Sequence, residues 1–486
     1  MTALDTPPRG VAGVGYDRST LATGIVHLGL GGFARAHLAR YTHDLMQADA
    51  DARRWGITGV GLRETDRPLI AALAAQDGLY TLTERDGTGA RSAVIGSLAG
   101  LLDASADTAP LLDAIDRDAV GIVTLTVTEH GYCLDRATRT LDRTHPLIVH
   151  DIETPDRPRS AIGVIVAAHA RRRRRNAPAF TALSCDNIQH NGDVLRGAVL
   201  SLAEASDPGL ARWIAEAATF PNAMVDRITP VPTEADMRDL RQRTGIADAA
   251  PLLAEPFRQW VIEDRFVAGR PAWEKVGAQF VGDVTPYEFM KLRLLNTSHL
   301  VVAGLGQLAG HERIDEAMAD PLIRRVMIAL MERETGPTLP PVPGVDLAAY
   351  KATLVARFGN PAIRDTTQRV NTDAPLNYLL DPLRDRLAAR ASVDLLALGL
   401  AAWLRRVRGT DDAGRPLTVQ HPLADALRAR AVEGGADPRP LLRMTALFGD
   451  LGQHRRLVAR AGDWLGQLYG SGVAGTLGKA AADGLI

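Results

Sequence analysis

The hydrophobic pattern changes character partway along the chain. Up to about residue 280, short apolar runs at residues 24–28, 57–62, 119–127 and 179–185 alternate with helical stretches. This alternation is typical of the buried parallel strands of an α/β domain. From about residue 284 helical periodicity dominates, and it predicts helices at residues 286–307, 315–334, 346–358, 381–407, 423–433 and 440–447.

These two patterns predict two domains, because 486 residues are too many for one hydrophobic core. We expect an α/β domain over residues 1–282, followed by a mostly α-helical domain over residues 283–486. Within the first domain, residues 1–23 are expected to form a mobile leader. Residues 220–230 are predicted to form a turn and a strand, and residues 255–266 a partly buried edge element.

The first apolar run leads into a glycine-rich turn that contains Gly29, Gly31, Gly32, Phe33 and Ala34. This is a G-x-G-x-x-A pattern between a strand and a helical stretch at residues 34–46. In such a turn the first glycine allows a tight bend, the second lets a pyrophosphate approach the backbone, and a small third residue permits close packing of helix on strand. We therefore predict that the α/β domain is a Rossmann-type dinucleotide-binding domain.

The second apolar run ends at Arg63, Glu64 and Asp66. An acidic residue at this point binds the adenosine ribose hydroxyls and favours NAD over NADP. The spacing from the glycines exceeds the usual ~20 residues, so the choice between Glu64 and Asp66 stays open. Arg63 would instead suit a 2′-phosphate, but we predict NAD as the cofactor.

Polar residues also follow the third and fourth runs, at the strand ends where open α/β sheets bind ligands. Thr128, Glu129 and His130 are candidates for the cofactor side, although a solvated loop explains them equally well. Asn187 is placed to point a carboxamide into a site. Alternatively, the Asp and Asn residues here simply cap the helix that follows.

A helix is predicted to begin close to the domain boundary. Thr285 can be its N-cap, Pro286 its first residue, and Glu288 the acidic partner of a capping box. At ~100° per residue, Glu288, Asn296 and His299 then share one arc with Lys291 in an otherwise apolar segment. Taken alone, a solvated lysine, a core histidine and a purely capping glutamate are simpler explanations.

Composition and charge exclude several classes. The longest apolar run, residues 395–403, is far short of the ~18 residues of a membrane span. A net charge of −1 gives no case for nucleic acid, and the run of five arginines at residues 171–175 is interpreted as a solvated helix end. Two cysteines 52 residues apart provide no zinc site and indicate a reducing cytoplasm. No metal is predicted.

Several segments together resemble the polyol-specific long-chain dehydrogenase/reductase family, which includes mannitol 2-dehydrogenases, D-arabinitol dehydrogenases and fructuronate and tagaturonate reductases. The matching segments run in order through both domains. They are HLGLGGFARAHLARY (27–41), TLTVTEHGYC (124–133), SCDNIQHNG (184–192), FPNAMVDRITP (220–230), EPFRQWVIEDRF (255–266), DVTPYEFMKLRLLNTSH (283–299) and RFGNPAIRDTTQRV (357–370).

The resemblance implies metal-independent, NAD-linked oxidation of a secondary alcohol in an open-chain polyol. Lys291 would be the general base, Asn187 and Asn296 would polarise the oxygen, and Glu288 could pass the proton towards water. It further implies that substrate contacts come from His299, Arg369 and Asp226. These roles suit the residue types, because a lysine acts as a base near neutral pH once burial lowers its pKa to about 7–8. Neutral amides stabilise a developing alkoxide without titrating.

The chain departs from the family pattern after Arg369. Pro375 stands where a serine is usual, and Asn377 stands where a lysine that contacts substrate is expected. The loss of a cation argues mildly against a uronate substrate, although Arg369 could compensate. We predict a polyol:ketose oxidoreductase, with a hexuronate reductase as the alternative and a dinucleotide-sensing protein as a remote one. The sequence leaves open a monomer or a small homo-oligomer.

Overall fold

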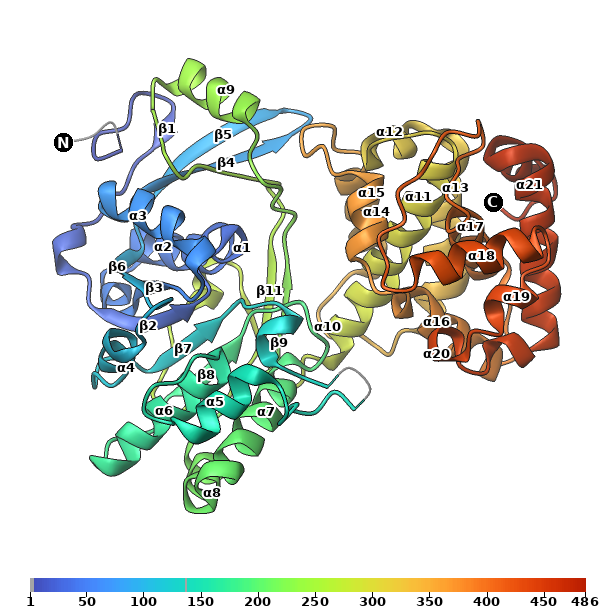
Figure 1. Ribbon diagram of the computed structural model, residues 1–486. Coiled ribbons are helices and arrows are strands. Elements are labelled where there is room, and N and C mark those ends of the chain that lie inside the picture. Colours follow the sequence, from blue (N-terminus) through green and yellow to red (C-terminus); the bar gives the residue numbers. More distant parts are fainter. Residues whose placement is uncertain (1–3, 136–137) are drawn as a thin grey trace. The chain divides into compact units, whose positions relative to one another are not determined.

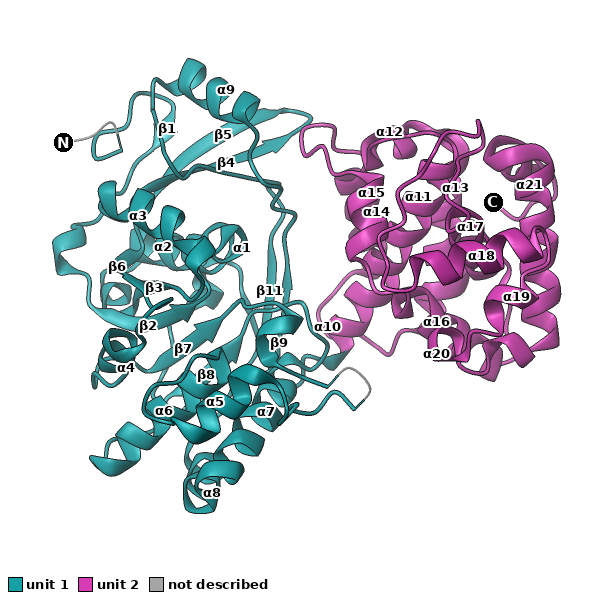
Figure 2. Cartoon of the chain, viewed as in Figure 1, with its two compact units in different colours: residues 1–285 teal, residues 286–486 magenta. Residues whose placement is uncertain are grey.

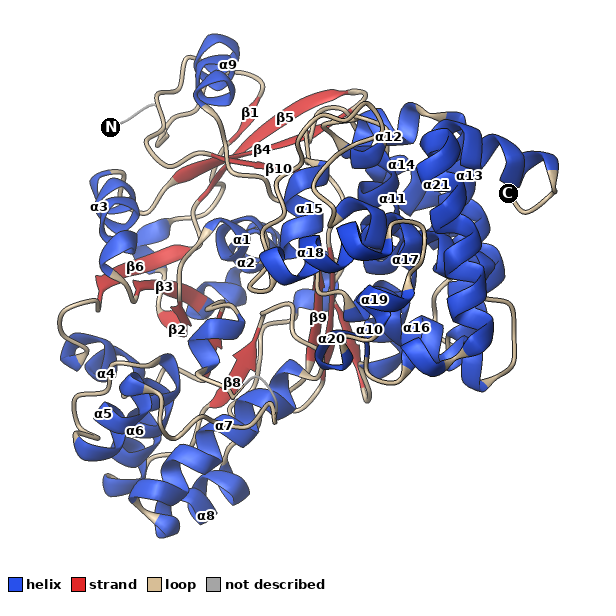
Figure 3. Cartoon of the chain, turned by 45° about the vertical axis from the view of Figure 1, so that its right-hand side comes forward, coloured by secondary structure: helices blue, strands red, loops and turns tan. Residues whose placement is uncertain are grey.

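The computed structural model describes residues 4–135 and 138–486 of the chain (Figure 1). The chain divides into two units, Met1–Thr285 (unit 1) and Pro286–Ile486 (unit 2), which are coloured separately in Figure 2. Unit 1 combines strands with helices, and unit 2 is built of helices (Figure 3). The predicted fold class, an α/β unit followed by a mostly helical one, is confirmed.

Unit 1 is organised around a parallel sheet with the strand order β6-β3-β2-β7-β8. The first strand of this sheet along the chain, β2, lies in its centre; β3 and β6 extend to one side, and β7 and β8 to the other. The order in which strands are added to the sheet therefore reverses between β2 and β7, which is the switch point of a Rossmann fold. The strands are β2 Thr23–Leu28, β3 Gly56–Gly61, β6 Leu98–Asp103, β7 Ile122–Leu125 and β8 Thr181–Ser184.

Both faces of the parallel sheet are buried. In β2, Ile25 belongs to one apolar cluster, and its neighbours Val26 and Leu28 belong to a second cluster. This follows from the alternation of side chains along a strand. The helices of unit 1 are α1 Gly32–Ala36, α2 Leu38–Ala48, α3 Arg67–Ala75, α4 Ala109–Ile115, α5 Pro146–Glu153, α6 Ala161–Arg174, α7 Asn191–Ser206, α8 Pro208–Ala217 and α9 Glu234–Thr244.

Two smaller sheets complete unit 1, with the strand orders β1-β5-β4-β10 and β12-β11-β9. Their strands are β1 Val11–Ala12, β4 Tyr80–Asp86, β5 Gly89–Ile95, β10 Leu252–Ala254, β9 Ala223–Asp226, β11 Gln259–Glu263 and β12 Gln279–Val281. The expected mobile leader is wrong for the described residues, because β1 pairs with β5 and Leu4 and Tyr16 are buried. The expected edge element is also wrong, because β11 is the buried middle strand of its sheet.

The single helix predicted at residues 34–46 is two helices in the structure. The backbone leaves the helical region at His37, whose φ and ψ are −113° and −82°. The His37 ring is buried, stacks on Phe33, and places Nε2 3.0 Å from the carbonyl oxygen of Gln259. The break thus joins the helix pair after the glycine turn to strand β11.

Unit 2 is arranged around α11, every residue of which is buried. This helix packs against α12, α13, α15 and α17. The helices of unit 2 are α11 Thr297–Leu308, α12 Ile314–Ala319, α13 Pro321–Leu330, α14 Leu347–Phe358, α15 Thr367–Asp373, α16 Asn377–Ala388, α17 Asp394–Arg406, α18 Ala424–Gly434, α19 Arg439–Leu442, α20 Thr445–Phe448 and α21 Arg455–Ala482; α10 is Thr285–Met290. None of the helices described here is long and apolar enough to cross a bilayer.

Three predicted helices of unit 2 are interrupted. The one expected at residues 440–447 is α19 and α20, which are separate helices. The one expected at residues 315–334 breaks at Asp320, whose carboxylate accepts the first free N–H groups of α13. The one expected at residues 381–407 is α16 and α17, which are separate helices. The pattern did not predict α15 or α21. Helix α21 contains many glycines, which are poor helix formers, and it is held by buried Trp464 and Leu465.

Candidate functional site

The glycine turn of unit 1 lies at the switch point of the parallel sheet, between the end of β2 and the start of α1. Gly29 has a φ of +84°, and a Cβ atom there would collide with the Thr126 carbonyl. A Cβ atom on Gly31 would meet only the Gly29 carbonyl oxygen, at 3.9 Å. Gly29 is therefore required by the fold itself, whereas Gly31 leaves an open approach to the backbone, as a bound pyrophosphate needs.

The remaining residues of the turn fix its packing. Gly32 begins α1, and a Cβ atom there would make ordinary contact with Leu252 at 3.5 Å. Ala34 is buried, in keeping with the small residue expected there. Arg35, which the sequence did not single out, is also buried and donates to the carbonyl of Ala250 at 2.6 Å.

The two acidic candidates after β3 have different surroundings. The Asp66 carboxylate accepts the backbone N–H groups of Leu62 at 3.1 Å and Arg63 at 3.0 Å, and forms an ion pair with the Arg63 guanidinium at 2.8 Å. Although burial alone would raise its pKa, these donors lower the pKa of Asp66 below its ordinary value. Asp66 therefore shapes the turn, whereas the Glu64 side chain is exposed.

The segment after β7 is held by a carboxylate from the neighbouring strand. Asp186, at the end of β8, accepts the N–H groups of Val127 and Thr128 and the hydroxyl of Tyr132. Thr128 has a φ of +61°, which is unusual for a β-branched residue. Thr128 and Glu129 are exposed beyond this clamp. Asp186 is thus not the helix cap that was the alternative explanation.

Asn187 follows Asp186 at the carboxyl end of β8 and is exposed. The nearby Asn191 side chain links this strand end to the β12-β11-β9 sheet. Its Nδ2 donates to the carbonyls of Asp186 at 3.0 Å and Ala223 at 2.8 Å, and its Oδ1 accepts the Ala223 N–H at 2.9 Å. Ala223 begins β9, and the predicted substrate residue Asp226 ends that strand, where it is buried.

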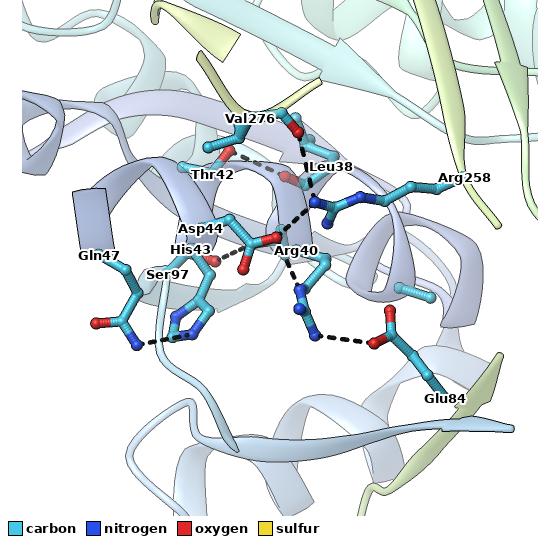
Figure 4. Close-up of polar contacts among 12 residues, drawn as sticks. Leu38, Arg40, Thr42, His43, Asp44, Gln47, Glu84, Ser97, Arg258 and Val276 are labelled. Carbon is cyan, nitrogen blue, oxygen red and sulfur yellow. Dashed lines mark hydrogen bonds and ion pairs between the residues drawn. The ribbon is translucent and has the colours of Figure 1, made fainter. Parts of the chain in front are cut away.

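A network of charges supports the strand that carries Asp226. The fully buried Arg227 side chain donates to the carbonyls of Ala36 and Glu255 and pairs with Glu84. Glu84 also pairs with Arg40, as Figure 4 shows. The network ends with Asp44, which lies between Arg40 at 2.9 Å and Arg258 at 2.7 Å (Figure 4). It joins α1 and α2 to the ends of β4, β9 and β10.

The helix predicted to carry the proton-transfer groups differs in its centre from a regular α-helix. Residues Lys291–Asn296 form a π-helix between α10 and α11, and Lys291 is only 8% exposed. A π-helix closes its hydrogen bonds five residues apart, so its turn is wider than that of an α-helix. The buried Asn296 is five residues after Lys291, so the wider turn brings it closer in direction to Lys291 than a regular spacing of ~100° per residue does.

The start of this helix also differs from the prediction. The N–H of Thr285 donates to the Asp283 carboxylate at 2.9 Å, so Asp283 takes the place of Glu288 in the expected capping box. Glu288 is buried one turn before Lys291. Its burial is unusual for a glutamate that serves only as a cap.

His299 and Arg369 are joined through Asp365, which the sequence did not single out. His299 Nε2 lies 3.4 Å from Asp365 Oδ2, and Arg369 forms two 2.6 Å hydrogen bonds to the same carboxylate. Burial would raise the pKa of Asp365, but His299 and Arg369 together hold it well below its usual range. Arg369 also lies 3.5 Å from Asp373, so two carboxylates share its charge. The spacing of Asp365 and Arg369, four residues apart, was the available signal.

Asn377 begins α16 and is exposed. The carbonyl of the next residue, Tyr378, accepts the Thr297 hydroxyl at 2.6 Å. Thr297 follows Asn296 directly, so this bond holds the start of α16 against the helix that carries Lys291 and His299.

Other candidates have structural roles. Four of the five arginines at residues 171–175 form ion pairs with nearby aspartates, as a solvated helix end would. The exception is Arg172, which is buried and donates to the carbonyls of Ile115, Arg117 and Val120. Both cysteines are buried. Within the described residues, no three His, Cys, Asp or Glu side chains are grouped as metal ligands would be.

Comparisons with known proteins agree with this division of the chain. Residues 23–275 match the mannitol dehydrogenase Rossmann domain, and residues 283–469 match the mannitol dehydrogenase C-terminal domain. The chain is 45% identical over 458 residues to D-mannonate oxidoreductase of Escherichia coli (strain K12), covering 93% of this chain and 94% of that protein. It is 44% identical over 454 residues to mannitol 2-dehydrogenase of Cereibacter sphaeroides, with 93% and 94% covered.

A solved structure shows the same likeness. Pseudomonas fluorescens mannitol 2-dehydrogenase, in a ternary complex with NAD and D-mannitol, is 40% identical and has a TM-score of 0.89. The match covers 99% of this chain and 98% of that one. The resemblance expected from the sequence motifs is confirmed, as is the enzyme class. The chain belongs to the mannitol dehydrogenase family of oxidoreductases.

Proposed function

We propose that this protein is an NAD-dependent dehydrogenase that interconverts a sugar alcohol, mannitol or a similar polyol such as D-arabinitol, and the corresponding ketose. The observation that carries the proposal is the buried π-helix that begins at Lys291 and ends at Asn296, whose wider turn brings the two residues closer in direction than an α-helix would. A base beside a neutral hydrogen-bond donor is what oxidation of an alcohol requires. The similarity to a mannitol 2-dehydrogenase described with NAD and D-mannitol supports it.

The residues of unit 1 fit NAD. Gly31 leaves room for a pyrophosphate against the backbone, and the exposed Glu64 can accept hydrogen bonds from the adenosine ribose. The Arg63 guanidinium is paired with Asp66, which makes it less suited to a 2′-phosphate and favours NAD over NADP. When bound, NAD supplies the hydride acceptor. Thr128 and Glu129 are the proposed contacts at the end of β7.

Lys291 takes the hydroxyl proton as the alcohol is oxidised. A lysine can accept a proton near neutral pH only where its surroundings disfavour the charged ammonium form, and the burial of Lys291 is in keeping with this role. Asn187 and Asn296 donate hydrogen bonds to the oxygen as it gains negative charge. Glu288, one turn before Lys291, passes the proton on towards water.

The substrate hydroxyls are bound by His299, Arg369 and Asp226, with Asn377 at the far end of the polyol. His299 is fixed by Asp365 on one side and by the Phe358 ring, 4.4 Å away between centroids, on the other. An immobilised imidazole can discriminate between hydroxyl positions, because reorienting it would break both contacts. Arg369, with its charge shared by two carboxylates, acts as a hydrogen-bond donor rather than as a free cation.

We further propose that the reaction needs no metal ion. Lys291 supplies the proton acceptor. The two amides supply the stabilisation of negative charge on the substrate oxygen that a zinc ion would otherwise provide. We also propose that the enzyme acts in the cytoplasm, as a monomer or a small homo-oligomer, and that its domains divide at residues 282 and 283.

A hexuronate reductase that forms an aldonate is the alternative. It is favoured by the 45% identity to D-mannonate oxidoreductase. Two features of unit 2 argue against it: Asn377 is uncharged, and the charge of Arg369 is already shared by Asp365 and Asp373. Neither Asn377 nor Arg369 therefore offers a full positive charge to the carboxylate of a uronate.

A substrate panel tests the proposal. Purified protein is assayed with polyols and NAD, and with ketoses and ketouronates and NADH, before and after exhaustive chelation. We expect turnover of a polyol and its ketose that survives chelation. A clear preference for fructuronate or tagaturonate would instead establish the alternative, and activity lost on chelation and restored by zinc would contradict the metal-free mechanism.

A further inference from the structure

Asp186 is a buried carboxylate to which the proposed reaction gives no role. It lies one residue before Asn187, and its Oδ1 accepts the Thr128 N–H at 2.8 Å. Its Oδ2 accepts the Val127 N–H at 3.1 Å and the Tyr132 hydroxyl at 2.9 Å. All three donors belong to the segment after β7. One side chain therefore ties together the carboxyl ends of two neighbouring strands.

The clamp holds Thr128 in a conformation that threonine rarely adopts. Its φ of +61° and ψ of 170° fall in a region occupied almost only by glycine. Such strain persists only where the surroundings enforce it. Here the enforcement is direct, since the carboxylate accepts the N–H of the strained residue and that of the residue before it.

The strained turn adjoins the glycine turn. Strand β7 pairs with β2, and the Thr126 hydroxyl donates to the Gly29 carbonyl at 3.0 Å. Because Asp186 accepts the N–H groups of Val127 and Thr128, neither is available to a phosphate. The glycine turn is thus the part of this edge that suits the pyrophosphate. A portion of a dinucleotide without phosphate, such as the nicotinamide riboside, suits the turn at Thr128.

We propose that Asp186 is a positioning residue for hydride transfer. By holding the backbone of Thr128 and lying next to Asn187, it sets the position of the nicotinamide end of the cofactor relative to the amide that binds the alkoxide. This inference rests on the proposed function. It adds a residue that contacts neither substrate nor cofactor and acts through Thr128 and Asn187.

Asp186→Asn is the isosteric test, because it keeps the volume and replaces one acceptor oxygen by a donor. Asp151 provides a matched control in the same unit. It is equally buried and accepts the N–H groups of Arg159 and Ser160 and the Ser160 hydroxyl, but it joins α5 to α6. Both variants are expected to lower the melting temperature.

Only Asp186→Asn is expected to disturb hydride transfer. We expect kcat to fall roughly 10- to 100-fold, the range given by loss of a hydrogen bond to a charged group. The primary deuterium isotope effect with NADH deuterated at the transferred position should rise, since the hydride step becomes slower. Asp151→Asn should change kcat less than about twofold at a temperature where both variants are folded. A kcat and isotope effect that match those of Asp151→Asn would overturn the proposal.

A second variant tests the link to Thr128. Glycine adopts the observed conformation without strain, so Asp186→Asn should lower kcat by a smaller factor in a Thr128→Gly background than in the wild-type background. An equal factor in both backgrounds would contradict the proposed clamp. If wild-type protein turned over no polyol or ketose, the proposed function would fail. In that case the NADH affinities of Asp186→Asn and Asp151→Asn would test the positioning role by themselves. Equal affinities would count against that role.

Discussion

The acidic partners of Arg369 determine how much positive charge unit 2 can offer to a substrate. Asp365 binds its guanidinium through two hydrogen bonds, and Asp373 lies 3.5 Å away. Asn377 adds a neutral amide where related enzymes are expected to carry a lysine. At the level of single residues, we therefore expect substrate choice to depend on Asn377, an exposed position that can be changed without disturbing the core.

Asn377→Lys should move the preference from ketoses towards ketouronates. The new ammonium group can pair with a sugar carboxylate, and we expect the ratio of kcat/KM for ketouronate to that for ketose to rise about tenfold, which corresponds to about 1.4 kcal/mol. The ratio is measured with NADH on both substrates. Asn377→Gln, which keeps the amide neutral, is the control. An unchanged ratio in Asn377→Lys would show that this position does not reach the substrate.

Residue identities were easier to predict than residue partners. The motifs contain Lys291, Asn296 and the glycines, so these could be singled out directly. The partners that the side chains of Asp186 and Arg227 bind are 28 or more residues away in the chain and become apparent only once the strands are paired. Asp66 illustrates the opposite case: its type suits a ribose contact, and its carboxylate also binds the turn that carries it.

At the level of secondary structure, the π-helix is the feature that periodicity could not reveal. A regular 3.6-residue repeat places Lys291 and Asn296 on one broad arc, and the wider turn brings them closer together in direction. The Thr297 hydroxyl donates to the carbonyl of Leu292, five residues earlier, at 3.0 Å. In the second π-helix, Met331–Thr335, the Thr335 hydroxyl likewise lies 3.4 Å from the carbonyl of Leu330.

Thr297→Val should therefore impair catalysis more than stability alone explains. The substitution keeps the side-chain shape but leaves the carbonyls of Leu292 and Tyr378 without this donor, at a cost of about 1–3 kcal/mol in the free energy of unfolding. We expect kcat to fall about tenfold as Lys291 and Asn296 lose alignment, measured alongside denaturant unfolding. Thr335→Val serves as the buried control and should affect unfolding only. Equal effects on kcat would count against a role for the first π-helix.

Other elements could have been found from the sequence. Residues 86–89 read Asp-Gly-Thr-Gly between two alternating segments, a strong hairpin signal, and they connect β4 to β5. The break at His37 carries no comparable signal, because no proline or glycine stands there. It follows from the packing of the His37 ring near β11, which is distant in sequence.

At the scale of the whole molecule, we expect the buried histidines of unit 1 to make it sensitive to acid. Unit 1 contains four fully or nearly fully buried histidines whose burial lowers their pKa from 6.5: His27 and His43 to about 4, and His37 and His169 to about 3. The unfolded chain binds protons at these positions more readily than the folded one does. Their contribution to stability is therefore present above about pH 6.5 and is lost as the pH falls towards 4.

We expect unit 1 to unfold cooperatively between about pH 6.5 and 4, because each such histidine removes up to about 3 kcal/mol from the free energy of unfolding. Circular dichroism and tryptophan fluorescence against pH measure this. His169 stacks on Phe180, and its ring nitrogens make no hydrogen bond within the described structure, so His169→Leu should lower the acid midpoint. His454→Leu, at an exposed position, should leave it unchanged. A midpoint unaffected by His169→Leu would contradict the assignment.

The rate of NAD reduction by a polyol at neutral pH, in wild type and in Lys291→Ala, tests the central claim most directly. Lys479→Ala, at an exposed position in the same unit, is the matched control. If Lys291 accepts the proton, Lys291→Ala should lose turnover while binding NADH almost normally, and Lys479→Ala should match wild type. Wild-type turnover by Lys291→Ala would contradict the assignment of the base and, with it, the proposed mechanism.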